Sequence, residues 1–138
     1  MDREDIIVAF FLAAAIFIII ISFVGESSIP EHPNIHLGVM NSSMRSGLSN
    51  STYLRVFFSN GCPACRKQMP VLETLAEKGL FIELVDVYKY PELAIAEDIS
   101  GTPALILIGP QGVQKWDGFT LEEEIWERVT NKSNLGGG

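Results

Sequence analysis

The sequence predicts an α/β fold: a mixed four-stranded sheet flanked by helices, in a minimal version, preceded by one transmembrane helix. Three observations predict it. Residues 6–24 form a nearly unbroken apolar run. Residues 53–58, 80–87 and 104–108 are short apolar runs of the kind that form buried strands. A helix-like pattern separates the first two of these, and a strand–helix–strand unit of this length implies a parallel crossover connection.

The apolar run over residues 6–24 is long enough to span a membrane. At about 1.5 Å per residue, roughly 19 residues extend about 28 Å, close to the ~30 Å core of a bilayer. The run is longer than the apolar part of a cleaved signal peptide, and no clear small-x-small cleavage site follows. We therefore expect residues 1–25 to be an uncleaved signal anchor. Because Arg3 precedes the run and the next basic residue is the distant Arg45, we expect a single-pass protein with a cytoplasmic N-terminus and an extracytoplasmic domain.

Residues 26–52 are rich in Ser, Asn, Gly and Pro and predict a flexible polar linker, within which residues 35–40 are an alternative short strand. The segment also holds four side chains that ligate soft metals, at intervals of four: His32, His36, Met40 and Met44. On a helix they would line one face. Pro33 and Gly38 disfavour a helix there, so we expect a solvated linker and no metal site.

Residues 53–131 are expected to form the folded domain, followed by a disordered tail over residues 132–138. Beyond the three strands already given, the expected elements are a helix over residues 66–78 that contains Pro70, a short helix over residues 91–98, the return strand of a hairpin over residues 113–117, and an amphipathic helix that starts near Leu121. These elements alternate as an α/β domain requires.

Cys62 and Cys65 are the only cysteines, and they form a Cys-Pro-Ala-Cys motif between a strand and a helix. This is the geometry of a redox dithiol. The free N–H groups and the dipole of a helix N-terminus favour a thiolate at Cys62. Arg66 and Lys67 follow in the same turn and are candidates for lowering the pKa of that thiol further; alternatively, they are solvated helix charges.

Composition excludes several other functions. The net charge is −7 and there is no basic cluster, so the chain lacks the patch that nucleic-acid binding needs. Two cysteines are too few for a disulfide framework or for a structural zinc site built from cysteines. We expect no cofactor and no bound metal.

Several features, taken in order, resemble the thioredoxin superfamily over about residues 53–130. The dithiol follows a strand, and Pro70 stands eight residues after Cys62, as the proline inside the helix does in thioredoxins. Gly101-Thr102-Pro103 matches the motif whose proline is cis in this family. Gly118 matches the glycine that follows the last strand.

The resemblance implies a thioredoxin-like fold and a thiol–disulfide oxidoreductase, which the apolar run over residues 6–24 is expected to anchor in a membrane. In that family the first cysteine attacks and the second resolves, which assigns these roles to Cys62 and Cys65. Thr102 and Pro103 are then the residues that contact the substrate chain. The implied partners are proteins with disulfides or dithiols, and a redox partner that supplies or accepts electrons.

Two positions depart from thioredoxin itself. Val56 stands where thioredoxin has a buried aspartate that assists proton transfer, and Gly61 stands where it has a tryptophan. The glutathione-binding Gly-Gly of glutaredoxins is also absent. Reduction, oxidation and isomerisation of client disulfides all stay open. So do two other classes of function: a metallochaperone or metal-site assembly factor that uses the dithiol, and a non-catalytic interaction module with an inert disulfide.

Overall fold

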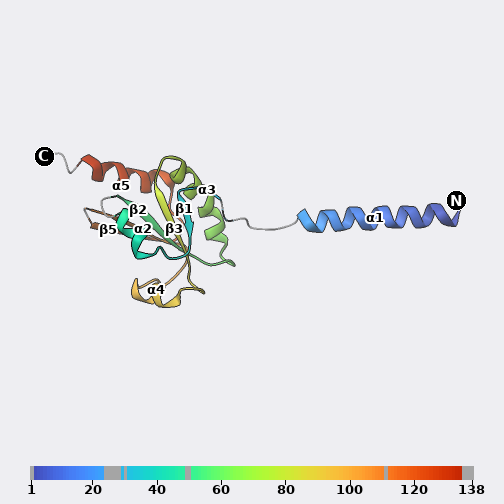
Figure 1. The fold of residues 1–138 in the computed structure, drawn as a ribbon, viewed down its shortest axis with the longest axis horizontal. Coiled ribbons are helices and arrows are strands. Elements are labelled where there is room, and N and C mark those ends of the chain that lie inside the picture. The colour runs from blue at the N-terminus through green and yellow to red at the C-terminus, as the bar shows by residue number, and fades with distance from the viewer. Residues whose placement is uncertain (1, 24–28, 30, 49–50, 111, 135–138) are drawn as a thin grey trace.

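A computed structural model describes residues 2–23, 29, 31–48, 51–110 and 112–134 of the chain. Side chains are described for residues 2–18 of the first helix and up to residue 131 of the last one. The elements are, in chain order, α1 (Arg3–Phe23), β1 (Ile35–Leu37), α2 (Ser42–Gly47), β2 (Tyr53–Phe58), α3 (Pro63–Glu77), β3 (Phe81–Asp86), α4 (Pro91–Ala96), β4 (Ala104–Gly109), β5 (Gly112–Asp117) and α5 (Glu122–Asn134) (Figure 1).

The strands form one mixed sheet in the order β1-β3-β2-β4-β5. β2 and β3 are parallel, with Tyr53 opposite Phe81 and Phe58 opposite Asp86, so β2–α3–β3 is the parallel crossover unit that the sequence predicts. β4 runs antiparallel to β2, and β5 runs antiparallel to β4. The predicted α/β mixed sheet is confirmed, but the predicted number of strands is wrong, because the sheet has five.

The additional strand is β1, which pairs in parallel with the outer edge of β3. It lies inside the segment 26–52, where the alternative strand expected over residues 35–40 is found over residues 35–37, and residues 42–47 of the expected flexible linker form α2. Ile35 packs against the core, and the Met40 side chain is only 2% exposed. The Asn41 side chain caps α2 by accepting a hydrogen bond from the Met44 N–H. The composition of this segment is that of a linker, but a few apolar side chains are enough to pack it against the rest of the domain.

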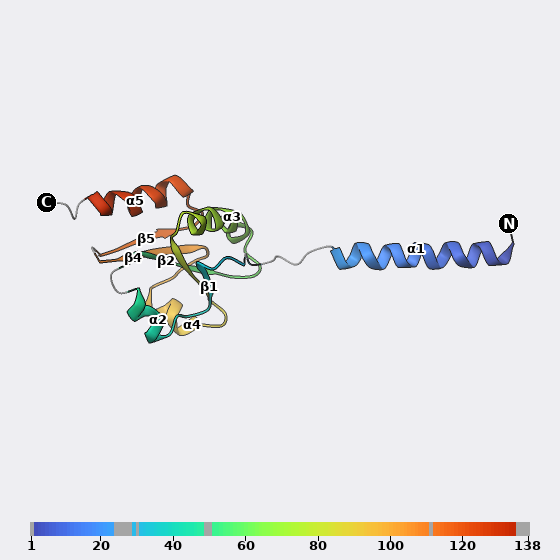
Figure 2. The ribbon, with the colours of Figure 1, turned by 45° about the horizontal axis from the view of Figure 1, so that its top comes forward.

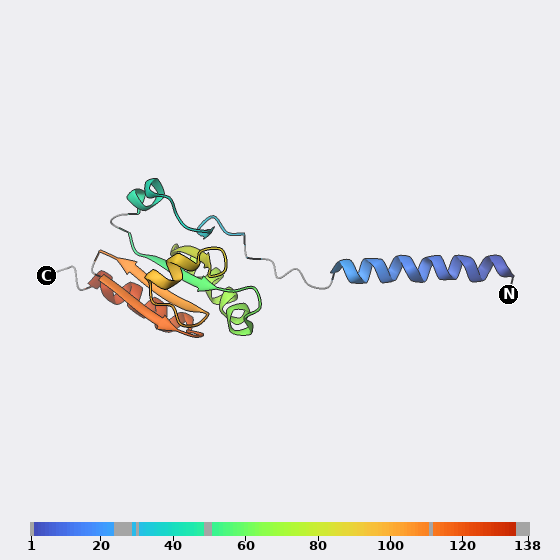
Figure 3. The same ribbon diagram turned by 90° about the horizontal axis from the view of Figure 1, so that it is seen from below.

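Helices cover both faces of the sheet, because successive side chains of a strand point to opposite faces. Val56 and Leu84 belong to an apolar cluster that includes side chains of α3 and α5. Phe57 and Val85 belong to a second cluster, which includes side chains of α4. Figure 2 shows α3 and α5 on one side of the sheet and α2 and α4 on the other, and Figure 3 shows α4 lying across the strands.

α1 is a 21-residue helix that stands apart from the sheet in Figure 1. Its described side chains are exposed, including Phe10 at 79% and Phe11 at 73%. Within the part of the chain that the structure describes, no helix is both long and apolar enough to cross a membrane. The transmembrane helix expected over residues 6–24 is therefore not found there. The side chains of residues 19–23, and residue 24 itself, lie outside the description.

The last helix is longer than the sequence predicts. α5 ends at Asn134, so it includes residues 132–134 of the expected disordered tail. Residues 135–138 lie outside the described residues.

Candidate active site

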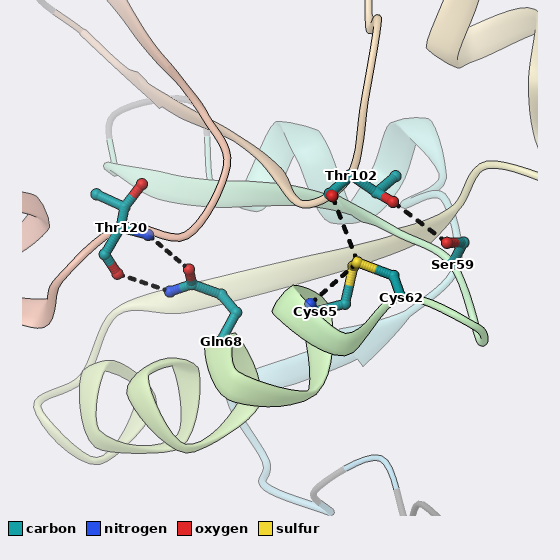
Figure 4. Close-up of a disulfide and its surroundings, with 6 residues drawn as sticks. All are labelled: Ser59, Cys62, Cys65, Gln68, Thr102 and Thr120. Atoms are coloured by element: carbon teal, nitrogen blue, oxygen red, sulfur yellow. Dashed lines mark hydrogen bonds between the residues drawn. A yellow bond between two sulfur atoms is a disulfide. The ribbon is translucent and has the colours of Figure 1, made fainter.

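Cys62 and Cys65 form a disulfide at the start of α3, with their Cα atoms 5.2 Å apart (Figure 4). β2 ends at Phe58, and a short turn leads to Cys62, the N-cap residue of α3. The Cys65 N–H donates a hydrogen bond to Cys62 Sγ over 3.1 Å. Pro63 occupies the first helical turn, where its missing N–H leaves no bond unmade. The first turn of α3 therefore directs the Cys65 N–H toward the Cys62 sulfur.

The two sulfurs lie in different environments. Cys65 is only 2% exposed and belongs to the apolar cluster between the sheet and α3. Cys62 is half-buried and lies at the margin of that cluster. Val56 is 1% exposed and belongs to the same cluster as Cys65, so the position that carries a buried acid in thioredoxin is apolar here.

The Thr102–Pro103 peptide bond is cis, as the resemblance implies. The Thr102 carbonyl oxygen lies 3.3 Å from Cys62 Sγ, a distance at which the thiol of the reduced form donates a hydrogen bond to it (Figure 4). The Thr102 hydroxyl and the Ser59 hydroxyl are 3.2 Å apart and share a second hydrogen bond. The loop before β4 is thus held against the turn that precedes the dithiol.

The turn between β5 and α5 forms the next part of this region. The Gly118 N–H donates a hydrogen bond to the Pro103 carbonyl over 2.7 Å. Two residues on, the Thr120 N–H donates to Gln68 Oε1 over 2.9 Å, and Gln68 Nε2 donates to the Thr120 carbonyl over 3.0 Å. These bonds join the turn both to the cis-proline loop and to α3.

The structure brings together Cys62, Cys65, Thr102 and Pro103. Arg66 and Lys67 also lie in α3, but both are exposed to solvent. Among the described residues, no group of three or more His, Cys, Asp or Glu side chains is arranged to hold a metal ion.

The histidines and methionines of the expected linker lie on different elements. His36 lies on β1, and the His32 ring nitrogen Nδ1 accepts a hydrogen bond from the Asn34 N–H. Met40 is buried against the sheet. Their spacing of four therefore does not place them on one helix face.

Sequence reasoning missed three residues of this region: Ser59, Gln68 and Thr120. One signal could have identified Gln68, which lies three residues after Cys65 and four before Leu72. This spacing puts it on the buried face of α3. A buried polar side chain needs a partner, and its presence predicts a specific contact.

Comparisons with known proteins give the same fold. No protein-family model matches the chain, and no curated protein does. Among solved structures, the chain is similar to a mutant thioredoxin from Halobacterium salinarum, with 24% identity, a TM-score of 0.63, and coverage of 74% of this chain and 94% of that one. It is also similar to a Schistosoma mansoni thioredoxin pre-protein, with 24% identity, a TM-score of 0.60, and coverage of 70% and 96%. A third similar structure is chloroplastic thioredoxin z, with 22% identity, a TM-score of 0.60, and coverage of 72% and 96%. The chain thus has a thioredoxin-like α/β fold with a disulfide of the C-x-x-C type.

Proposed function

We propose that this chain is a thiol–disulfide oxidoreductase that acts on protein substrates through Cys62 and Cys65. The observation that carries the proposal is the disulfide at the start of α3, facing the cis Thr102–Pro103 peptide on a thioredoxin-like fold. Both cysteines of an inert structural disulfide are typically buried. Cys62 is only half-buried, so a substrate sulfur can reach it.

The contrast between the two sulfurs supports the order of their roles. The Cys65 N–H and the N-terminus of α3 stabilise negative charge on Cys62 Sγ in the reduced form. Burial in an apolar cluster disfavours the charged thiolate of Cys65. Cys62 is therefore the attacking residue, and Cys65 is the resolving residue.

Reduction of a client disulfide then takes two exchanges. The Cys62 thiolate attacks one client sulfur, forms a mixed disulfide, and releases the other client sulfur as a thiolate. Cys65 loses its proton and attacks Cys62 Sγ, which releases the second client thiolate. The client gains two electrons, both client thiolates take up protons, and the Cys62–Cys65 disulfide forms. The same steps in reverse oxidise a client, so a redox partner must supply or accept the two electrons.

The Thr102 carbonyl supports a role for this loop in substrate binding. It is a backbone acceptor next to Cys62, and Pro103 has no N–H that could donate to the sulfurs. An extended client segment would donate a backbone N–H to it while its sulfur reaches Cys62. The exposed charges of Arg66 and Lys67 lie in the same helical turn and would add to the stabilisation of the Cys62 thiolate.

The proposal includes a membrane anchor formed by residues 6–24, with the domain outside the cytoplasm. The exposed apolar side chains of α1, such as Phe10 and Phe11, support an apolar surrounding for this helix. Retention in the membrane pellet after alkaline extraction tests the anchor. Labelling of reduced Cys62 in intact cells by an impermeant maleimide tests the orientation, because a cytoplasmic domain would stay unlabelled.

Reduction of insulin by dithiothreitol tests the proposed activity, using the full chain in detergent. We expect the chain to accelerate the reaction, Cys62→Ser to abolish the acceleration, and Cys65→Ser to accumulate a mixed disulfide on a non-reducing gel. Thr74→Ala is the matched control, since it removes a hydrogen bond to the Pro70 carbonyl in α3 away from the sulfurs. A wild-type rate no higher than that of Cys62→Ser would refute the activity. Equilibration with glutathione then gives the redox potential.

A further inference from the structure

We propose that Gln68 is a positioning residue for thiol–disulfide exchange. Its side-chain amide holds the turn after β5 against α3, and so fixes the part of the site that faces Cys62. The inference rests on the proposed function, but the contacts that carry it involve a residue outside the dithiol and the cis-proline loop.

The contact between Gln68 and Thr120 is closed to water and complete. The Gln68 side chain is 0% exposed and Thr120 is 4% exposed. The amide donates to the Thr120 carbonyl and accepts from the Thr120 N–H, so each partner satisfies the other (Figure 4). Two parallel bonds fix both the distance and the orientation of the turn, which an apolar side chain at the same place would not do.

The contact lies one helical turn from the dithiol. Gln68 follows Cys65 by three residues in α3. Its contact with the turn after β5 therefore fixes the position of that turn relative to the helix that carries both sulfurs. The buried face of this helix is otherwise apolar near the pair, with Leu72 one turn further on. No second polar side chain on the buried face of α3 shares this task, among the residues that the structure describes.

The same turn extends to the other side of the site. Two residues before Thr120, the Gly118 N–H binds the Pro103 carbonyl. The Thr102 carbonyl, one residue earlier, lies 3.3 Å from Cys62 Sγ. The turn is therefore connected to the dithiol on two sides: through α3 and through the cis-proline loop. Gln68 supplies the side-chain hydrogen bonds that join α3 to the turn.

This arrangement predicts a difference between large and small substrates. An extended client segment lies against the Thr102 carbonyl, so its binding depends on where that loop is held. A small aromatic disulfide such as dithiodipyridine needs only access to Cys62. Loss of the Gln68 contact should therefore raise the KM for a protein disulfide and leave the reaction with the small disulfide nearly unchanged.

The test compares two variants of the full chain in detergent. Gln68→Met keeps the length of the side chain and removes both hydrogen bonds, which leaves the buried Thr120 backbone groups unpaired. Thr74→Ala is the control, because it removes another side-chain hydrogen bond of α3, to the Pro70 carbonyl, and keeps the contact between Gln68 and Thr120. We expect kcat/KM for insulin to fall about tenfold in Gln68→Met, mainly through KM, with the dithiodipyridine rate within about twofold of wild type. Thr74→Ala should stay within about twofold in both assays.

Gln68→Glu provides a rescue experiment. The introduced carboxyl has nearly the same shape, and in its protonated form it both donates and accepts, so it can reproduce the pair of bonds. Burial favours that form, since the Gln68 side chain is 0% exposed, while Lys67 on α3 is exposed to solvent. Insulin activity relative to wild type at the same pH should be near normal at pH 5 and reduced at pH 8. This variant decides the question if Gln68→Met does not fold.

Equal loss of both activities in Gln68→Met, no loss of either, or an equal loss in Thr74→Ala would overturn the inference. Absence of activity in the wild type would instead refute the proposed function. In that case amide exchange decides, since it needs no substrate: the Gly118 N–H should lose protection in Gln68→Met and keep it in Thr74→Ala. Unchanged protection of Gly118 in both variants would refute the coupling.

Discussion

Glu83 provides the sharpest test of what stabilises the domain. Its side chain is 0% exposed, and Oε2 accepts a hydrogen bond from Arg55 Nε over 2.5 Å. Oε1 accepts from the Met40 N–H over 2.7 Å, which ties the segment after β1 to the sheet. Glu83→Gln preserves the shape and the bond to Met40, but it removes the negative charge and places an N–H donor against Arg55. A buried arginine then loses its main counter-charge.

The magnitude follows from burial. Removing one partner of a buried ion pair costs about 3–5 kcal/mol, because an uncompensated charge stays behind. Arg55 keeps a second contact to Glu97, whose side chain is 34% exposed, so we take the lower value. A loss of about 3 kcal/mol in a domain of this size lowers the melting temperature by roughly 12–24 °C. The assay is thermal unfolding of the full chain in detergent, followed by near-ultraviolet circular dichroism.

Glu97→Gln is the matched control, since it removes a half-exposed partner of the same arginine and should cost at most about 1 kcal/mol. Removing both buried charges, with Arg55→Met and Glu83→Gln together, should restore much of the stability, because it removes the unpaired charge and keeps the acceptor for the Met40 N–H. Equal and small losses of stability in Glu83→Gln and Glu97→Gln would refute the reasoning, since burial would then make no difference to the stabilisation that an ion pair gives.

Three further predictions concern the core, the N-terminal segment and the site. Leu72→Ala should lower the free energy of unfolding by about 2–5 kcal/mol, because the side chain is 0% exposed; a loss below about 1 kcal/mol in chemical denaturation would contradict the packing. Asn41→Ala removes the cap that accepts from the Met44 N–H, so amide exchange should quicken in α2 and stay unchanged in α3. Phe119→Ala removes an aromatic ring that is 45% exposed and lies next to Gly118 in the sequence. The KM for insulin should rise severalfold, with an unchanged rate for dithiodipyridine. Equal changes in both assays would argue against contact between this ring and the client.

The central part of the fold could be predicted because its signals are local. Residues 53–58 are apolar enough to be a buried strand, and the C-x-x-C motif marks the start of α3. β1 could be suggested from the sequence only as an alternative to a linker, over residues 35–40. It has three residues, and its position depends on pairing with β3 and on the Met40 bond to Glu83. Such contacts between distant residues leave little trace in local composition.

The same distinction between local signals and contacts between distant residues applies to the site. Cys62, Cys65 and the cis proline are found by motif, since each occupies a fixed place along the chain. Gln68 could be placed on the buried face of α3, but its partner is the backbone of Thr120, and a backbone group has no sequence signature. Positioning contacts to the backbone are therefore the part of a site that sequence reasoning finds last.

The alternation of side chains along β2 and β3 also determines which groups can assist the dithiol. Arg55 lies opposite Glu83 and Val56 lies opposite Leu84, so the buried carboxylate and the Cys65 cluster occupy opposite faces of the sheet. Glu83 therefore cannot take the role that a buried aspartate has in thioredoxin. In the proposed reaction the first exchange releases a client thiolate beside the site, and we expect this thiolate to accept the Cys65 proton before the second exchange. The apolar surroundings of Cys65 favour its neutral thiol, so attack by Cys65 waits until the released client thiolate accepts its proton.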